Sequence, residues 1–242
     1  GGIGPEIIAK AARTMRGEHA PEFIVCGSAD AMRSAERQLG LDGPVPYRMV
    51  DVGPVAAPVV TGTVTAAGGE WAYRAVERAV RMVQAGEADA IVTAPLSKEA
   101  LHLAGHAFEG HTELLAHLTG QRDAVMMLAH GGMRVSHVTT HCALSEVPSR
   151  VTPQRLRRVF DVTLDALRTL GFDAPRIGVA GLNPHSGEGG VLGTEDDAVI
   201  APVIREYAAR GVAITGPVPG DTVFIKLRAG QFDAVVAMFH DQ

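Results

Sequence analysis

The sequence predicts an α/β fold with mostly parallel strands, and three observations support this prediction. Helical and extended patterns alternate along almost the whole chain of 242 residues. Hydrophobic residues make up 46% of the chain but aromatic residues only 5%, which favours thin layers packed through small aliphatic side chains. Several short apolar runs end directly in polar residues, at the position where open α/β sheets bind their ligands.

The first half of the chain alternates helices with short apolar segments. A helix is expected over 6–15 behind Pro5, because proline is tolerated in the first turn of a helix. Ser28 is a predicted N-cap for a helix over 29–39. The longest helical pattern covers 66–84. The other expected elements are extended segments at 23–26, 47–52 and 90–93 and a helix over 112–118.

The second half begins with two strands, 124–129 and 134–140, that flank Gly131-Gly132 and therefore predict a hairpin. Thr152 is a predicted cap, with Pro153 in the first position, of a helix that ends near 170. Further strands are expected at 176–182, 212–215 and 234–239, and further helices at 195–210 and 222–229.

Glycines mark the expected division of the chain into two domains. Gly105 and Gly110 loosen the stretch from 95 to 110. The prediction is a first α/β domain over 1–104 and a second over 105–242.

Charge and cysteine content exclude several classes of protein. The net charge of −5 and the pI of about 6.1 give no basic footprint, so nucleic acid is not expected as a partner. The sequence contains no Lys/Arg tract of the kind that binds an anionic membrane surface. No apolar run reaches the roughly 18 residues of a membrane-spanning helix. Cys26 and Cys142 lie far apart and form no CxxC motif, so a reducing compartment, the cytoplasm, is expected.

Three predicted strands run toward a histidine: His141 follows 135–140, His185 follows 177–182 and His240 follows 234–239. Three imidazoles beyond strand ends suggest a divalent metal with an open position for water or substrate. His137 is set aside as a ligand, because four residues of strand would separate it from His141 by about 13 Å.

Three further motifs each carry a functional and an ordinary interpretation. The loop Gly181–Gly190 offers backbone N–H groups to an anion or cofactor, or is a flexible surface loop. His111 and Thr112 open a predicted helix whose N-terminus suits phosphate, or Thr112 is an ordinary cap. Asp221 stands at the tip of a rigid turn, where capping of the next helix by Asp221 or Thr222 is the favoured interpretation. Neither G-x-G-x-x-G after a strand nor G-x-x-x-x-G-K-[ST] occurs.

Taken together, these motifs resemble the 4-hydroxythreonine-4-phosphate dehydrogenase family of pyridoxal phosphate biosynthesis. The matching stretches follow the family's order: Gly2–Glu6, Thr93–Pro95 with Lys98, Phe108–Glu113, Thr139–His141, Gly181–Gly190, Gly216-Pro217 with Asp221-Thr222, and Met238–Gln242. No single motif is decisive, but the ordered set is specific and covers nearly the whole chain.

The resemblance implies an isocitrate/isopropylmalate-dehydrogenase-like fold of two α/β/α domains and a homodimer with the active site between subunits. It assigns metal binding to His141, His185 and His240, drawn from both monomers, and substrate contact to His111 and Thr112. It also implies a further segment beyond Gln242 that completes the first domain and supplies a Lys, an Asn and an Arg to the substrate. The second domain is expected to carry the metal histidines and the dimer interface.

The implied reaction is the NAD- or NADP-linked oxidation of 4-hydroxythreonine 4-phosphate, followed by decarboxylation to 3-amino-2-oxopropyl phosphate. Zinc is the expected metal, with cobalt or magnesium as alternatives. Asp221 is the candidate general base, because it ionises and lies in a matching motif. Paralogues are expected to act on 4-phosphorylated threonate or erythronate, or on cis-dihydrodiols of aromatic dicarboxylates.

Two other classes remain open from the residues themselves. Three histidines also suit a metallohydrolase or lyase that activates water. A structural metal or phosphate-binding domain is the alternative without catalysis. It is disfavoured, because structural zinc sites have four ligands, often with cysteine.

Overall fold

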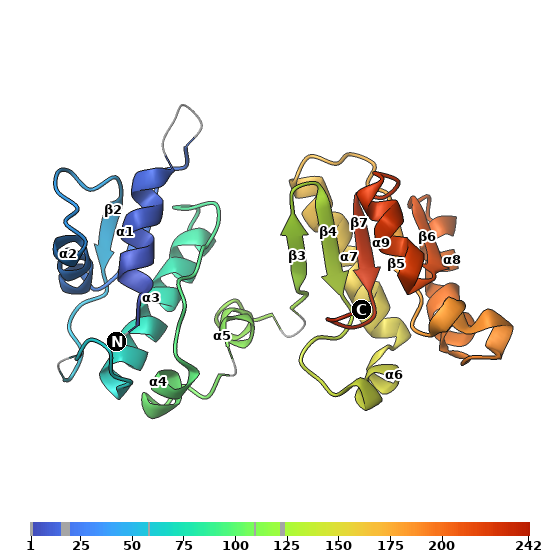
Figure 1. Cartoon of the computed structure of the whole chain (residues 1–242), viewed down its shortest axis with the longest axis horizontal. Coiled ribbons are helices and arrows are strands. Elements are labelled where there is room, and N and C mark those ends of the chain that lie inside the picture. The colour runs from blue at the N-terminus through green and yellow to red at the C-terminus, as the bar shows by residue number, and fades with distance from the viewer. Residues whose placement is uncertain (1, 16–19, 58, 109, 122–123) are drawn as a thin grey trace. The chain divides into compact units, whose positions relative to one another are not determined.

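The computed structural model (Figure 1) describes residues 2–15, 20–57, 59–108, 110–121 and 124–242. The chain forms two compact units, Gly1–Ala124 and Val125–Gln242. The division therefore falls later than the expected boundary at 104/105. The reason is packing: Leu114, from a helix expected in the second domain, is buried against Val76 and Val80 of the first unit.

In the described residues of the first unit the elements are, in chain order, α1 (Gly4–Thr14), β1 (Ile24–Gly27), α2 (Ala29–Gln38), β2 (Arg48–Asp51), α3 (Ala66–Gln84), α4 (Lys98–Leu103) and α5 (His111–Leu118). The two strands pair in parallel, with Ile24 opposite Arg48. The expected Ser28 cap is confirmed, because its side chain accepts a hydrogen bond from the Ala31 N–H at 3.2 Å.

The strand expected over 90–93 is not formed. This segment is irregular, and Val92 is 95% exposed. An apolar run becomes a strand only where a neighbouring strand takes up its backbone hydrogen bonds. Within the described residues of this unit, the sheet consists of β1 and β2.

The second unit begins with β3 (Met127–His130), β4 (Met133–His137), α6 (Val147–Arg150) and α7 (Pro153–Thr169). It continues with β5 (Ile177–Ala180), a 3-10 turn over Pro184–Gly190, a π-helix over Asp196–Ile200, α8 (Ala201–Ala209), β6 (Ile214–Val218), α9 (Gly220–Arg228) and β7 (Ala234–Ala237). The strand order is β3-β4-β7-β5-β6. The hairpin β3–β4 is antiparallel as predicted, and the other pairs are parallel.

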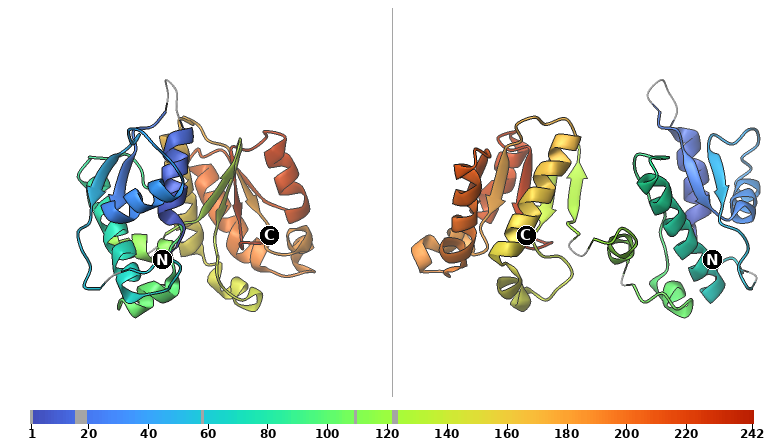
Figure 2. Two further views of the ribbon diagram at one scale, coloured as in Figure 1. Left: turned by 60° about the vertical axis from the view of Figure 1, so that its left-hand side comes forward. Right: turned by 180° about the vertical axis from the view of Figure 1, so that it is seen from behind.

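Helices cover both faces of this sheet, as the views in Figure 2 show. The larger core joins α7 and α8 to Ile177, Val179 and Val236 of the central strands. The smaller core joins α9 to Ala180 and Val235 on the other face. Because β5 and β7 are buried on both sides, they read as continuous apolar runs in the sequence.

The strand order places β4, β7 and β5 next to one another and in parallel. Their carboxyl ends therefore share one edge of the sheet, the usual ligand-binding edge of such folds. None of the helices in the described parts of the chain has the length and apolar character needed to cross a membrane.

Candidate active site

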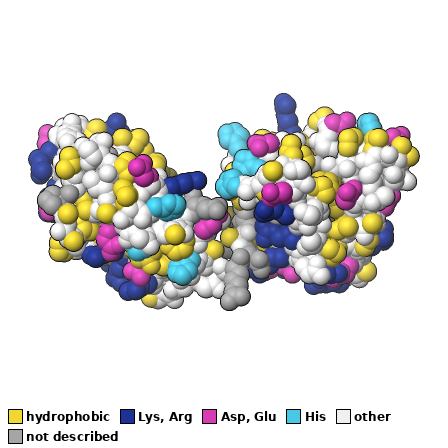
Figure 3. All heavy atoms as spheres, turned by 90° about the horizontal axis from the view of Figure 1, so that it is seen from below, with side chains coloured by type: hydrophobic (Ala, Val, Ile, Leu, Met, Phe, Trp, Pro, Cys, Tyr) yellow, Lys and Arg dark blue, Asp and Glu magenta, His cyan; other side chains and the backbone are white. Residues whose placement is uncertain are grey.

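His141 and His240 lie close together beyond neighbouring strands. The backbone after β4 stays paired with β7, since the N–H groups of Val138 and Thr139 donate to the carbonyls of Ala237 and Met238. The buried Thr139 hydroxyl adds a hydrogen bond of 2.8 Å to the Met238 carbonyl. These contacts hold the two imidazole centroids 6.0 Å apart. Figure 3 shows histidine side chains gathered at the surface of this unit.

The turn after β7 is fixed by the side chain of Gln242. Its Oε1 accepts from the Met238 N–H at 2.7 Å, and its Nε2 donates to the Gly181 carbonyl at the end of β5. Gln242 thus ties the His240 turn to the neighbouring strand. His240 Nδ1 lies 3.1 Å from an Asp241 carboxylate oxygen. This contact directs Nε2 away from Asp241 and leaves it available to a ligand.

His185 stands in an unusual loop beyond β5. Its backbone has a φ of 51°, and Ser186 and Glu188 also have positive φ values, of 53° and 45°. Residues with a side chain rarely adopt this left-handed conformation. The His185 side chain is exposed. The surrounding structure therefore holds the His185 loop in this conformation, and the loop is not simply a flexible connection.

Imidazole nitrogens of His141 and His240 are a suitable partial donor set for a transition metal. Within the described ranges, however, no three His, Cys, Asp or Glu side chains lie close enough to hold a metal ion. The single chain brings His141 and His240 together and leaves His185 outside that pair.

His137, which the strand spacing separates from His141, lies against His240 instead. It is 2% exposed, and its ring stacks on the His240 ring with centroids 5.4 Å apart and an interplanar angle of 19°. Burial lowers the pKa of His137, so the neutral imidazole is favoured. Residue spacing along β4 predicts nothing about β7, whose position only the folded sheet provides.

The predicted substrate residues His111 and Thr112 lie in the first turn of α5, in the first unit. The expectation that Thr112 caps the helix is wrong: the N-cap is Gly110, and no side chain caps it. Burial lowers the pKa of His111, partly offset by a hydrogen bond to the Ala94 backbone. His111 therefore meets a ligand as a neutral hydrogen-bonding group more readily than as a cation.

Asp221 lies in the first turn of α9 and is exposed. The favoured interpretation of Asp221 or Thr222 as a cap is wrong, because the helix begins at Gly220 after Pro219 without a side-chain cap. A Cβ placed on Gly220 would lie 3.5 Å from Gln242 Nε2. The first turn of α9 thus adjoins the turn that carries His240.

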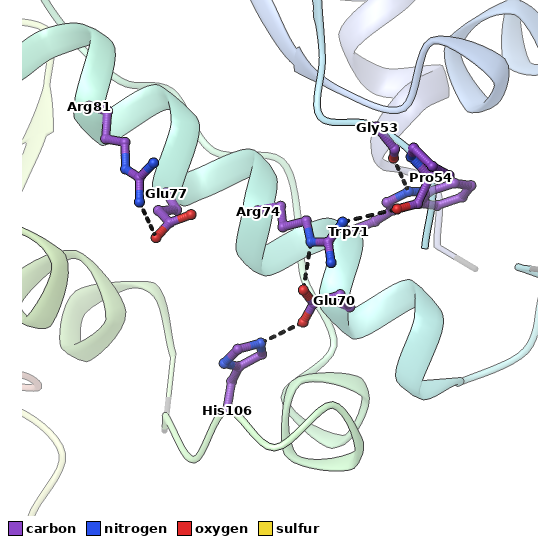
Figure 4. Close-up of polar contacts among 8 residues, drawn as sticks. All are labelled: Gly53, Pro54, Glu70, Trp71, Arg74, Glu77, Arg81 and His106. Atoms are coloured by element: carbon purple, nitrogen blue, oxygen red, sulfur yellow. Dashed lines mark hydrogen bonds and ion pairs between the residues drawn. The ribbon is translucent and has the colours of Figure 1, made fainter. Parts of the chain in front are cut away.

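A polar cluster in the first unit was missed by the sequence reasoning (Figure 4). Glu70 of α3 bonds Arg74 at 2.6 Å and His106 Nε2 at 2.8 Å. The His106 ring also stacks on Tyr73, with centroids 3.7 Å apart. The Glu70–His106 contact spans 36 residues, so no local pattern could reveal it. It anchors the loop that precedes α5 and His111.

Comparison with known proteins agrees with this geometry. Residues 6–242 match the model of the family described as pyridoxal phosphate biosynthetic protein PdxA. A protein of Bradyrhizobium diazoefficiens, named as a candidate D-threonate 4-phosphate dehydrogenase, is 53% identical over 100% of this chain and 74% of its own length. The D-threonate 4-phosphate dehydrogenase of Salmonella typhimurium is 40% identical over 100% of this chain and 78% of its own.

The crystal structure of 4-hydroxythreonine-4-phosphate dehydrogenase from Klebsiella pneumoniae has 41% sequence identity and a TM-score of 0.88, covering 99% of this chain and 77% of that one. The expected fold is thereby confirmed. The relatives are named dehydrogenases, which confirms the expected oxidoreductase class with its nicotinamide cofactor. The chain belongs to the PdxA family of pyridoxal phosphate biosynthetic proteins.

Proposed function

We propose that this chain is a divalent-metal-dependent NAD(P) dehydrogenase that oxidises the secondary alcohol of a 4-phosphorylated hydroxy acid, with loss of carbon dioxide afterwards. D-threonate 4-phosphate is the first candidate substrate, because the 53% identical relative carries that name. 4-Hydroxythreonine 4-phosphate is the second. The observation that carries the proposal is the pair His141 and His240, 6.0 Å apart at the ligand-binding edge of the sheet.

The proposed metal ligands are His141, His185 and His240, which follow the three adjacent strands β4, β5 and β7. A bound divalent cation supplies electrophilic stabilisation of negative charge on the substrate in both the oxidation and the decarboxylation. Neutral imidazoles suit zinc or cobalt, and magnesium would retain water ligands. The Asp241 contact to His240 Nδ1 supports this role by setting the ring's tautomer.

A homodimer would complete the site. His141 and His240 meet within one chain, whereas His185 stands outside that pair. A second copy would contribute the third imidazole, so the metal would bind at a subunit interface. The two free cysteines, Cys26 and Cys142, support function in the reducing cytoplasm.

His111 and Thr112 are proposed to bind the substrate phosphate or carboxylate from the first turn of α5. Lowered basicity makes His111 a neutral donor rather than a cation. Asp221 is proposed as the general base that takes the hydroxyl proton, since its helix turn adjoins the His240 turn through Gln242.

The test is a substrate panel with the natural full-length protein, with and without a chelator, followed at the nicotinamide absorbance. Reduction of NAD(P) with D-threonate 4-phosphate, abolished by chelation and restored by zinc or cobalt, is expected. His185→Ala should abolish turnover, and His130→Ala, at an exposed histidine of the same unit, should not. Hydrolytic turnover without nicotinamide reduction would instead place the chain among metallohydrolases.

Mixing two inactive variants tests the shared site. A dimer of His141→Ala with His185→Ala has one site that lacks both ligands and one that is intact. Random mixing should therefore restore roughly a quarter of wild-type activity, since half of the dimers are mixed and each has one intact site. No recovery after verified subunit exchange would show that all three histidines act within one chain.

A further inference from the structure

The loop that presents His185 rests on a single buried carboxylate. Asp196, the first residue of the π-helix Asp196–Ile200, is 0% exposed. Its Oδ1 accepts from the Leu182 N–H at 2.8 Å, and its Oδ2 accepts from the N–H and side-chain Nδ2 of Asn183, both at 3.0 Å. Both carboxylate oxygens therefore bind the backbone immediately before Pro184 and His185.

The same carboxylate contacts the loop on either side of His185. A Cβ added to Gly181 would lie 2.9 Å from Asp196 Oδ1 and 2.6 Å from Ser186 Oγ. A Cβ on Gly187 would lie 3.6 Å from Asp196 Oδ2. The chain thus wraps around Asp196 and closes over it. No side chain fits at these two glycines without displacing the loop or the carboxylate.

This arrangement offsets two unfavourable contributions to the free energy of folding. A buried carboxylate is unfavourable unless hydrogen bonds satisfy it, and here three uncharged N–H donors do so. The left-handed backbone at His185, Ser186 and Glu188 is unfavourable unless its surroundings impose it. The π-helix, a distortion often found at functional sites, puts Asp196 under the loop.

We infer that Asp196 is a positioning residue: its carboxylate holds the left-handed loop that presents the His185 imidazole beyond β5. The inference rests on the proposed function, in which His185 is a metal ligand. Asp196 itself is buried and touches neither substrate nor metal in this role. Asn183 takes part as the donor that connects the loop to both Asp196 and Glu195, its Nδ2 lying 2.9 Å from Glu195 Oε2.

Asp196→Asn tests the inference, because it keeps the side-chain size but replaces one acceptor oxygen by an NH2 group that faces an N–H donor. Asp233→Asn is the matched control. Its carboxylate accepts three hydrogen bonds from Arg176, at the opposite end of β5. The measurements are zinc affinity, by competition with a chromophoric chelator, and amide hydrogen exchange of the metal-free full chain.

Asp196→Asn should weaken zinc binding by about 10–100-fold, the usual effect of losing a group that orients a ligand. It should also accelerate exchange of the Leu182 and Asn183 amides. Asp233→Asn should lower thermal stability without either change. If Asp196→Asn fails to fold, Asn183→Ala removes one donor and leaves the carboxylate in place, and a smaller change in the same direction is expected.

The outcomes separate the two hypotheses. One outcome is that His185→Ala binds zinc weakly, while the Asp196 and Asn183 variants keep wild-type zinc affinity and wild-type amide exchange. This outcome would overturn the positioning role of Asp196 and leave the proposed metal site standing. Undiminished zinc binding by His185→Ala would overturn the proposed metal site, and the positioning role would fall with it.

Discussion

Gly69, inside α3, lies against the backbone of α4, and Gly69→Ala tests that contact. A Cβ there would lie 1.9 Å from the Ala100 carbonyl oxygen and 2.3 Å from its carbonyl carbon, whereas real Cβ contacts essentially never fall under 3.0 Å. The atoms in the way are backbone, so α4 must retreat as a body. That movement would disturb the packing of Leu101, which is 0% exposed.

Two effects of Gly69→Ala oppose each other. Alanine in place of glycine favours a helix interior by about 1 kcal/mol. Forced overpacking costs about 1–3 kcal/mol, and the upper end applies where backbone must move. Because the steric overlap is the larger of the two effects, the free energy of unfolding should fall by about 2 kcal/mol. For a chain of this size, such a loss lowers the Tm by roughly 4–8 °C.

Urea unfolding followed by circular dichroism measures this change. Gly27→Ala is the control in the same unit, since a Cβ there meets nothing within 4 Å. It should change stability by less than about 0.5 kcal/mol, as surface substitutions do. A Gly69→Ala protein as stable as wild type would refute the close approach of α3 and α4.

Three other predictions concern the core and the titrating groups. Phe160→Ala should cost about 3–5 kcal/mol of stability in urea unfolding. Phe160 is 0% exposed, and its ring packs edge-on against the Tyr207 ring with centroids 5.2 Å apart. A cost under about 1 kcal/mol would contradict this packing. Burial, together with a hydrogen bond to a carboxylate, raises the pKa of Tyr47 and of Tyr207 to about 12, so the fold favours their neutral form. Stability should therefore be lost as pH rises from about 10 toward 12. Tyrosinate absorbance that appeared near pH 10 in a still folded protein would count against this prediction. The hydrogen bond from His106 lowers the pKa of Glu70, so the stabilising effect of this bond is present above the ordinary carboxyl pKa and lost on acidification. His106→Phe should raise the Glu70 pKa in a carboxyl NMR titration. An unchanged Glu70 pKa would disprove the coupling.

Several features that depend on nearby residues were predicted correctly from the sequence, although the caps expected at Thr112 and at Asp221 or Thr222 were not. The helix over 66–84 has the bounds expected, and Ser28 and Thr152 cap their helices through side-chain oxygens. The Gly131-Gly132 hairpin forms as the antiparallel pair of β3 and β4. These features rest on periodicity, caps and turns, whose physics acts over a few residues.

Predictions that needed a distant partner were less successful. The segment 90–93 has the composition of a strand but is not paired as one in the described structure. The domain boundary moved because α5 packs on α3 through Leu114. Gln242, His106 and Asp196 act on residues that are distant along the chain, so neither spacing nor motif drew attention to these contacts.

That His141, His185 and His240 each follow an apolar strand, and that the family's motifs occur in order, can be read from the residues alone. Which side chains lie next to these histidines depends on the folded sheet. Strand order depends on which faces α7, α8 and α9 cover, and this long-range packing inserts β7 between β4 and β5. As a result His240 lies beside both His141 and His137. Likewise, only the fold brings a buried carboxylate, 11 residues after His185 in the sequence, onto the backbone N–H groups of Leu182 and Asn183.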